Sequence, residues 1–240
     1  MPAAVTAAAP AIVVLHALDL NPADAGASAR FGASAIKNGY VLVTPVAIDA
    51  SWNAGTCCVP AAAEGIDDVQ FVSNVIDGLV NQQTIDARRV YVAGFSNGAM
   101  LAYRIGCERS QAVAGVAVVA GVLTVDTCAP SDATDMMAIH QMGDPEVPFV
   151  GTDTSKLSID GHLPGVAESF DRWAKGFRCE LDGRSEIDGR VTRERYKCAD
   201  RAKAEVVTIA GGDHSWPVAA SSIDSVEAIV EFFGLNVAAK

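Results

Sequence analysis

Residues 89–100 read Arg-Val-Tyr-Val-Ala-Gly-Phe-Ser-Asn-Gly-Ala-Met, an apolar run of β type followed by a Gly-x-Ser-x-Gly turn and a helix-forming segment. In such a strand-turn-helix the serine takes a strained backbone conformation and its hydroxyl stands clear of the main chain. We expect a side chain at Gly94 or Gly98 to collide with the neighbouring strand or helix. Ser96 is therefore predicted to be a nucleophile above the positive end of a helix. The alternative is a chance Gly-x-Ser-x-Gly pattern in a glycine-rich chain.

A serine hydroxyl is a weak nucleophile at neutral pH, so it needs a histidine base and a carboxylate, in the chain order Ser, Asp or Glu, His. Of the four histidines, only His162 and His214 follow the serine and the next two predicted strands. No strand leads into His162. His214 follows the β-branched run 205–210 and a glycine-rich turn, which predicts a loop at the carboxyl end of a strand. His214 is therefore the expected base.

The expected acid is Asp144. It follows the buried strand predicted at 136–140, so it should leave that strand at the end equivalent to the end that carries His214. The alternative for Asp144 is an ordinary turn aspartate before a proline. Three other aspartates precede the strand and would emerge at its opposite end: Asp126, Asp132 and Asp135.

Acyl transfer at a serine also requires an oxyanion hole, usually two backbone N–H groups. Asn97 follows the nucleophile and supplies the first. The second should come from the loop after the apolar run 11–16, which makes Ala17 or Leu18 the candidate. His16 is expected to pack or hydrogen-bond beneath this loop rather than to act as a second base.

The remaining pattern predicts one α/β domain over residues 1–240, because strands and helices alternate along the chain. A mostly parallel sheet of about six strands with helices on both faces follows. The strands are expected near 11–17, 40–46, 89–95, 113–119, 135–141 and 203–210. Apolar residues recur at helical spacing in 67–83, 166–173 and 226–233, and Asp67 with Gln70 predicts a helix N-cap.

Charge and hydropathy narrow the classes of partner. The formal net charge is −11, which disfavours nucleic acid and anionic membranes. The longest apolar stretch, near 113–123, is too short to span a bilayer. The oligomeric state stays open.

The six cysteines lack metal-ligand spacing, so no metal is expected. Adjacent Cys57 and Cys58 should not bond to each other easily, because the intervening peptide would distort. Cys179 and Cys198 bracket a polar segment, 180–197, that is typical of a hairpin, and we expect them to pair, which would contribute roughly 3 kcal/mol. The alternative is six reduced thiols in a cytosolic enzyme. Residues 1–10 lack the basic start and long apolar core of a secretion signal.

These motifs occur in the order of a known family. The segments Trp-Asn-Ala-Gly-Thr-Cys-Cys at 52–58, Gly-Phe-Ser-Asn-Gly at 94–98 and Gly-Gly-Asp-His-Ser-Trp-Pro at 211–217 resemble the polyhydroxybutyrate depolymerase-like esterases, which include feruloyl and acetylxylan esterases. Further matches lie at 15–16, 67–69, 102–104, 107–108, 119–121, 140, 144 and 147–148. The resemblance covers about residues 11–235.

This resemblance implies an α/β-hydrolase fold with Ser96, Asp144 and His214 as the catalytic triad. It also implies a secreted or periplasmic protein and bonds from Cys57 and Cys58 to Cys107 and Cys128, in an order that stays open. Family members usually begin with an antiparallel strand pair before the first core strand. Only ten residues precede that strand here, so we expect a sheet without the pair.

The chain departs from the family pattern at two positions. Ala17 stands where the family has the glycine of a His-Gly pair, and an alanine does not readily take positive φ, so the second oxyanion donor could shift. Gln141 stands where a glycine is expected after His140. Neither change removes a member of the triad.

The predicted activity is serine carboxylic-ester hydrolysis without a cofactor. The ester substrate would be short-chain, hydroxyalkanoate or plant-wall linked (feruloyl or acetyl), with Trp52 and Trp216 as candidate walls of the substrate cleft. For each tryptophan the alternative is a cover over the end of the sheet. The alternative functions are a ligand- or carbohydrate-binding homologue without catalysis, and a serine peptidase.

Overall fold

The protein is built around one sheet of eight strands. The computed structural model describes residues 9–21, 26–219 and 223–236. The strands are β1 (Ala9–Leu15), β2 (Val41–Val43), β3 (Ile85–Phe95), β4 (Gly115–Val119), β5 (Asp135–Gln141), β6 (Glu180–Ile187), β7 (Val191–Lys197) and β8 (Lys203–Ile209). Their order in the sheet is β2-β1-β3-β4-β5-β8-β7-β6. The first six strands of this order run parallel, so their carboxyl ends share one edge.

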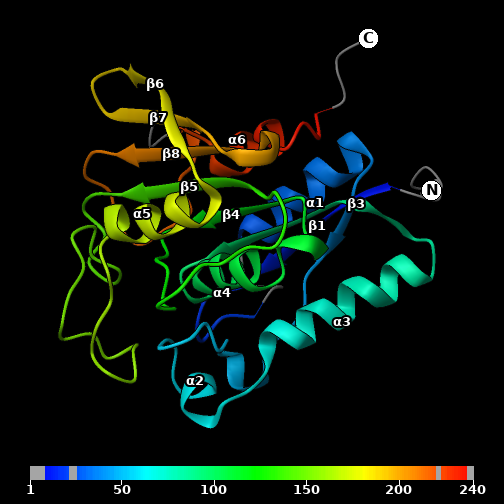
Figure 1. Cartoon of the computed structure of the whole chain (residues 1–240), viewed down its shortest axis with the longest axis horizontal. Helices are drawn as coiled ribbons and strands as arrows, with labels where there is room; N and C mark the ends of the chain where they lie inside the picture. Colours follow the sequence, from blue (N-terminus) through cyan, green and yellow to red (C-terminus); the bar gives the residue numbers. More distant parts are fainter. Residues whose placement is uncertain (1–8, 22–25, 220–222, 237–240) are drawn as a thin grey trace.

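The sheet is larger than the sequence predicts. All six predicted strands are present, but the polar hairpin 180–197 also joins the sheet, which raises the count from six to eight. The reason is that β7 pairs antiparallel with β8 along its whole length, so the hairpin satisfies the free edge of the parallel sheet. Figure 1 shows β7 and β6 continuing the sheet beyond β8. The expectation of a sheet without an antiparallel pair before β1 concerns residues 1–8, which lie outside the described residues.

Helices cover both faces of the sheet, as the strand-helix alternation predicts. They are α1 (Gly26–Asn38), α2 (Ala61–Glu64), α3 (Asp68–Asn81), α4 (Asn97–Glu108), α5 (Val166–Phe177) and α6 (Ser225–Phe232), with short 3₁₀ turns at Ile48–Ala50, Ser110–Ala112 and Ala199–Arg201. One core lies between the sheet and α3, α4 and α5, and includes Val72, Leu101 and Trp173. A second core lies between the other face and α1 and α6, and includes Phe31 and Ile229.

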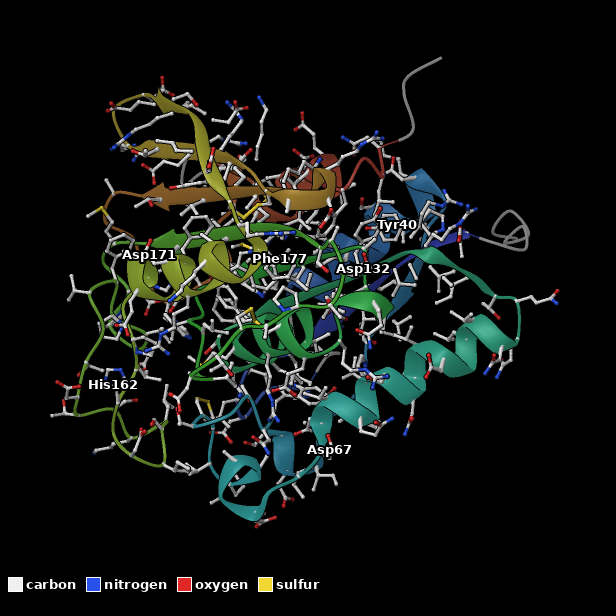
Figure 2. The ribbon with its side chains drawn as sticks, viewed as in Figure 1. Tyr40, Asp67, Asp132, His162, Asp171 and Phe177 are labelled. Atoms are coloured by element: carbon white, nitrogen blue, oxygen red, sulfur yellow. A yellow bond between two sulfur atoms is a disulfide. The ribbon has the colours of Figure 1, made fainter. Side chains whose placement is uncertain are left out.

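The helix starts follow from the local sequence. The Asp67 side chain accepts a hydrogen bond from the Gln70 N–H, as predicted, and Figure 2 shows Asp67 at the start of α3. Asp224 caps α6 by accepting from the N–H groups of Val226 and Glu227. It also pairs with Arg30 at 2.9 Å, which ties α6 to α1.

All six cysteines are paired, but not in the predicted pattern. Cys179 bonds to Cys198 as expected, at the base of the β6-β7 hairpin. Cys107 of α4 bonds to Cys128, and Cys57 bonds to Cys58 across a cis peptide, so the prediction that Cys57 and Cys58 reach Cys107 and Cys128 is wrong. The sulfur atoms of Cys107 and Cys128 meet directly, which leaves Cys57 and Cys58 only each other, with Cα atoms 3.0 Å apart.

Within the described ranges, no helix is long and apolar enough to cross a membrane. In the same ranges, no group of three or more His, Cys, Asp or Glu side chains is arranged to hold a metal ion.

Candidate active site

Ser96 occupies a sharp turn between β3 and α4, with φ 54° and ψ −120°. Two glycines make this turn possible. A Cβ on Gly94 would lie 2.2 Å from the carbonyl oxygen of Gly98, and a Cβ on Gly98 would lie 2.4 Å from the carbonyl oxygen of Leu15. The collision predicted from the sequence is therefore present at both positions, and the first turn of α4 packs directly against the end of β1.

The His214 imidazole reaches Ser96 from the loop after β8. Its Nε2 lies 2.9 Å from the Ser96 Oγ, and its Nδ1 lies 2.8 Å from the Asp144 Oδ2. Since a carboxylate only accepts, Nδ1–H donates to Asp144 and the serine hydroxyl donates to the free Nε2. The Phe95 ring packs 4.8 Å from the imidazole, centroid to centroid. The structure thus brings together the three side chains that the sequence nominates.

The carboxylate of Asp144 is buried but fully engaged. Burial acts to raise the pKa of Asp144, but hydrogen bonds from His214 and from the Val147 and Glu146 N–H groups outweigh it, so the pKa lies below its ordinary value. The carboxylate is ionised at neutral pH. It can therefore orient the His214 ring and stabilise a positive charge on it.

Two further histidines lie close to the site as neutral structural groups. His140, at the end of β5, donates from Nε2 to the Val147 carbonyl, and this nitrogen is 3.7 Å from the Asp144 Oδ2. His16 donates from Nδ1 to the Ala17 carbonyl and accepts from the Ala47 N–H. Burial lowers the pKa of both. His16 lies beneath the loop after β1, as the sequence predicts.

The backbone N–H groups of Asn97, which directly follows the serine, and of Ala17 and Leu18, in the loop after β1, have no hydrogen-bond partner in the described part of the chain. Asn97 begins α4, where the first N–H groups of a helix have no acceptor within the helix. Ala17 takes no positive φ, and the left-handed residue of its loop is Asp19, with φ 58°. The loop therefore accommodates an alanine at position 17, because Asp19, two residues later, takes the left-handed conformation instead.

Trp52 does not line a cleft. Its side chain is completely buried, donates from Nε1 to the His16 carbonyl at 3.0 Å and packs against the His16 ring. The prediction that Trp52 forms a substrate wall is therefore wrong, because the hydrogen bond draws the indole beneath the loop after β1. The alternative reading, a tryptophan that covers the end of the sheet, describes it correctly.

Trp216 borders a small pocket whose lining includes Phe95 and Ser215, the chain neighbours of Ser96 and His214, but neither of those two residues. It is partly exposed and stacks on Phe95, with ring centroids 5.5 Å apart. The pocket holds about 220 Å³ and is mostly apolar. Its lining includes Val14, Ala17, Leu20, Phe95, Ser215 and Trp216. It therefore lies between the loop that carries Ala17 and the loop that carries His214.

His162 and the competing aspartates lie elsewhere. His162 is exposed in the long loop between β5 and α5, where its Nδ1 is 2.7 Å from Asp153, and Figure 2 shows it at the outer margin of that loop. Asp132 and Asp135 lie at the start of β5, the end opposite to Asp144. These placements agree with the sequence-based choice of His214 and Asp144.

Sequence reasoning missed two polar side chains around the triad. The Asn97 amide exchanges two hydrogen bonds with the backbone of Trp52, and the Gln141 amide contacts both residues beside His214. The signal available in the sequence was position: Asn97 directly follows Ser96, and Gln141 directly follows His140.

Two solved structures with a similar fold carry esterase names. An acetyl xylan esterase from Aspergillus awamori superposes with a TM-score of 0.66 at 14% identity, covering 96% of this chain and 90% of that chain. Esterase PE8 gives a TM-score of 0.62 at 16% identity, covering 98% and 95%. At such identities the likeness concerns the fold, and it confirms the predicted α/β-hydrolase architecture.

The family model described as "Esterase PHB depolymerase" matches residues 1–167, so the chain belongs to that family. Feruloyl esterase B of Piromyces equi is 27% identical over 69% of this chain and 31% of its own length. Putative esterase NocK of Nocardia uniformis is 26% identical over 87% of this chain and 65% of its own length. The chain thus spans about a third of the first relative and just under two thirds of the second.

Proposed function

We propose that the protein is a serine carboxylic-ester hydrolase that works through an acyl-enzyme. The observation that carries the proposal is the continuous hydrogen-bond chain from Ser96 through His214 to Asp144. Membership of an esterase family and the esterase names of its relatives support the same reaction class. The proposed catalytic residues are Ser96, His214 and Asp144.

In the first step His214 Nε2 takes the hydroxyl proton as the Ser96 oxygen attacks the ester carbonyl. The imidazolium then returns this proton to the departing alcohol oxygen as the carbon–oxygen bond breaks. Asp144 holds the Nδ1–H tautomer and stabilises the imidazolium. In the second step a water molecule attacks the acyl-serine, His214 takes its proton, and the acid leaves while Ser96 regains its hydrogen.

The tetrahedral intermediates carry a negative charge on the former carbonyl oxygen. We assign its stabilisation to the Asn97 N–H together with that of Ala17 or Leu18, since these donors have no other acceptor in the described ranges. The positive end of α4 adds to the same field.

The substrate contacts that we propose lie in the 220 Å³ pocket lined by Phe95, Ser215 and Trp216. Its apolar walls, with Trp216 and Leu20 at the rim, suit the hydrocarbon part of a short acyl group. Hydroxyalkanoate esters and acetyl or feruloyl esters of plant-wall polymers belong to the same proposal, because the names of the family and of its relatives point to them. A panel of acetyl, butyryl, feruloyl and hydroxybutyrate-oligomer esters ranks these substrates.

The decisive test is Ser96→Ala with p-nitrophenyl acetate and butyrate. Hydrolysis should fall to background while circular dichroism and the thermal midpoint stay close to wild type. Ser185→Ala, on the remote strand β6, is the matched control and should keep full activity. A fluorophosphonate should label the wild type once per chain, at Ser96. Near-wild-type turnover by the alanine variant overturns the assignment.

Two other functions remain as outcomes of these experiments. A folded wild type that neither reacts with the fluorophosphonate nor cleaves any ester would be a binding protein that keeps the fold without catalysis. A serine peptidase would cleave the amide and the ester of one acyl group at comparable rates, so matched ester and amide substrates separate it from an esterase.

We also propose an oxidising compartment, outside the cytoplasm, as the working location. The support is the pairing of all six cysteines in the structure.

A further inference from the structure

Gln141 is the last residue of β5 and lies between the two strand ends that carry the acid and the base. Its backbone pairs with Ile209 of β8, the strand that leads to the His214 loop. Its carbonyl oxygen accepts a hydrogen bond from the Asp144 N–H at 3.2 Å. The main chain of Gln141 therefore borders the turn that carries the acid.

The side chain of Gln141 reaches in the other direction, into the loop that carries the base. Its Nε2 lies 2.6 Å from the Asp213 carbonyl oxygen and 3.3 Å from the Ser215 carbonyl oxygen. These are the residues on either side of His214. The same nitrogen is 3.4 Å from both the Asp213 Oδ1 and the Ser215 Oγ.

The neighbouring backbone is shaped around this amide. A Cβ on Gly212 would lie 2.2 Å from the Gln141 Oε1, and Gly212 has φ +83°, so this position requires glycine. Gly143 donates from its N–H to the Gly211 carbonyl at 2.8 Å, which joins the two loops a second time. Gln141 itself is 3% exposed, so its amide is largely shielded from bulk water.

Only a donor can serve at this point. The side-chain nitrogen faces two carbonyl oxygens, a carboxylate oxygen and a hydroxyl, and a primary amide supplies two N–H groups to them. A carboxylate at this position would be repelled by the carbonyl and carboxylate oxygens. An apolar side chain would leave the Asp213 and Ser215 carbonyls without this hydrogen-bond donor. The distances thus define a clamp on the backbone of 213–215.

We propose that Gln141 is a positioning residue that fixes the His214 imidazole between Asp144 and Ser96 by clamping residues 213 and 215. This proposal rests on the proposed ester hydrolysis for its kinetic consequence. Gln141 touches none of the reacting atoms and does not itself line the described pocket, so it should influence kcat through the position of the base and leave the substrate KM nearly unchanged.

The test is Gln141→Met, which keeps the length of the side chain and removes the donors. With p-nitrophenyl butyrate, kcat per fluorophosphonate-titrated site should fall about 10- to 100-fold, because small displacements of a catalytic group have effects of this size. The KM should stay within about twofold of wild type, the usual reading of a change that spares ground-state binding. Hydrogen exchange of the backbone amides in 211–216 should become faster.

Gln141→Glu adds a readout that a general packing defect would not give. The ionised carboxylate should lower kcat more than methionine does at pH 8, and protonation at lower pH should restore one donor. The ratio of the Glu variant's kcat to the Met variant's kcat should therefore rise as the pH falls.

Two matched variants separate positioning from loss of stability. Gln70→Met changes an exposed glutamine on α3 and should leave both kcat and loop exchange at wild-type values. Ser169→Ala removes buried hydrogen bonds in α5 and should lower the thermal midpoint without lowering kcat per titrated site. A Gln141→Met enzyme with wild-type kcat per site and unchanged exchange in 211–216 overturns the proposal. Unchanged exchange alone tells against the clamp even if the wild type hydrolyses no ester, so the two proposals fail separately.

Discussion

The side-chain amide of Asn97 pairs with the backbone of Trp52, 45 residues earlier in the chain. The Trp52 N–H donates to Oδ1 and the amide Nδ2 donates to the Trp52 carbonyl, each at 2.8 Å. The Trp52 indole in turn donates to the His16 carbonyl. The residue that follows the nucleophile therefore anchors the loops after β1 and β2 through its side chain, while its own N–H stays available to an oxyanion.

Asn97→Ala should destabilise the fold because it leaves the N–H and carbonyl of Trp52 buried without partners. Each orphaned group costs about 1–3 kcal/mol, and urea unfolding of the variant measures the sum. Asn74→Ala, at an exposed position of α3, is the control and should stay near the wild-type midpoint. Equal midpoints for the two variants would contradict the anchoring role of Asn97.

Asp144→Asn should leave the fold intact and lower kcat by a factor on the order of 10⁴, because an amide no longer selects the Nδ1–H tautomer of His214 or stabilises the imidazolium. Burst kinetics with p-nitrophenyl acetate measure the acylation rate directly. A loss of less than tenfold would mean that another group orients the base, and His140, 3.7 Å from Asp144, would be the first to examine.

The stability of the protein should rise with pH between about 5 and 7. Burial lowers the pKa of His16 and His140 below the ordinary value of 6.5, so the unfolded chain binds protons in this range that the folded chain does not. For His140 the Asp144 carboxylate opposes this shift and His214 adds to it. The contribution is complete above the unfolded pKa and is lost as the pH falls below it, by at most about 1.4 kcal/mol per histidine per pH unit.

Urea unfolding at pH 5.5, 6.25 and 7.0 checks this expectation. Replacing His140 by Gln removes one titrating group, so the slope of the unfolding free energy against pH should decrease relative to wild type. A slope that is unchanged, or steeper, in His140→Gln would show that His140 keeps its proton in the folded protein.

The disulfide pattern predicts a specific peptide map. Trypsin cuts after Lys37 and Arg88 without a site between them, so Cys57 and Cys58 stay in one fragment, 38–88. In an unreduced digest this fragment should carry an internal disulfide, while fragment 105–109 should be linked to fragment 110–156 through Cys107 and Cys128. A link between 38–88 and either of the other two fragments would contradict the structure.

The sequence predicts the parts of the site that local patterns encode. Ser96, Asp144 and His214 each follow a recognisable strand, and parallel strands place their carboxyl ends at one edge, so three distant residues could be expected together. The six parallel strands were recognisable for the same reason. Their apolar runs are long enough to be read without tertiary information.

The wrong predictions concern partners chosen in three dimensions. Trp52 has the same local signature as a cleft residue, but its indole is buried, with its N–H on the His16 carbonyl and its ring against the His16 imidazole. The sequence-based expectation for Cys57 and Cys58 assumed an ordinary peptide bond between them. In the structure this peptide is cis, and the two cysteines are bonded to each other. The hairpin 180–197 was expected, but its docking on β8 is decided by the free edge of another strand. The role of Gln141 depends on residues 72 and 74 positions later in the chain, which no local pattern encodes.

The β6-β7 hairpin affects how readily another chain can pair with this edge of the sheet at high protein concentration. It moves the free rim of the sheet from the hydrophobic β8 to β6, where four ionisable side chains follow one another at alternate positions: Glu180, Asp182, Arg184 and Glu186. A charged edge strand pairs poorly with another chain, because pairing would require partial desolvation of these charged side chains. At this edge of the sheet the hairpin therefore disfavours pairing with another chain, and the Cys179–Cys198 bond joins the two strands at its base.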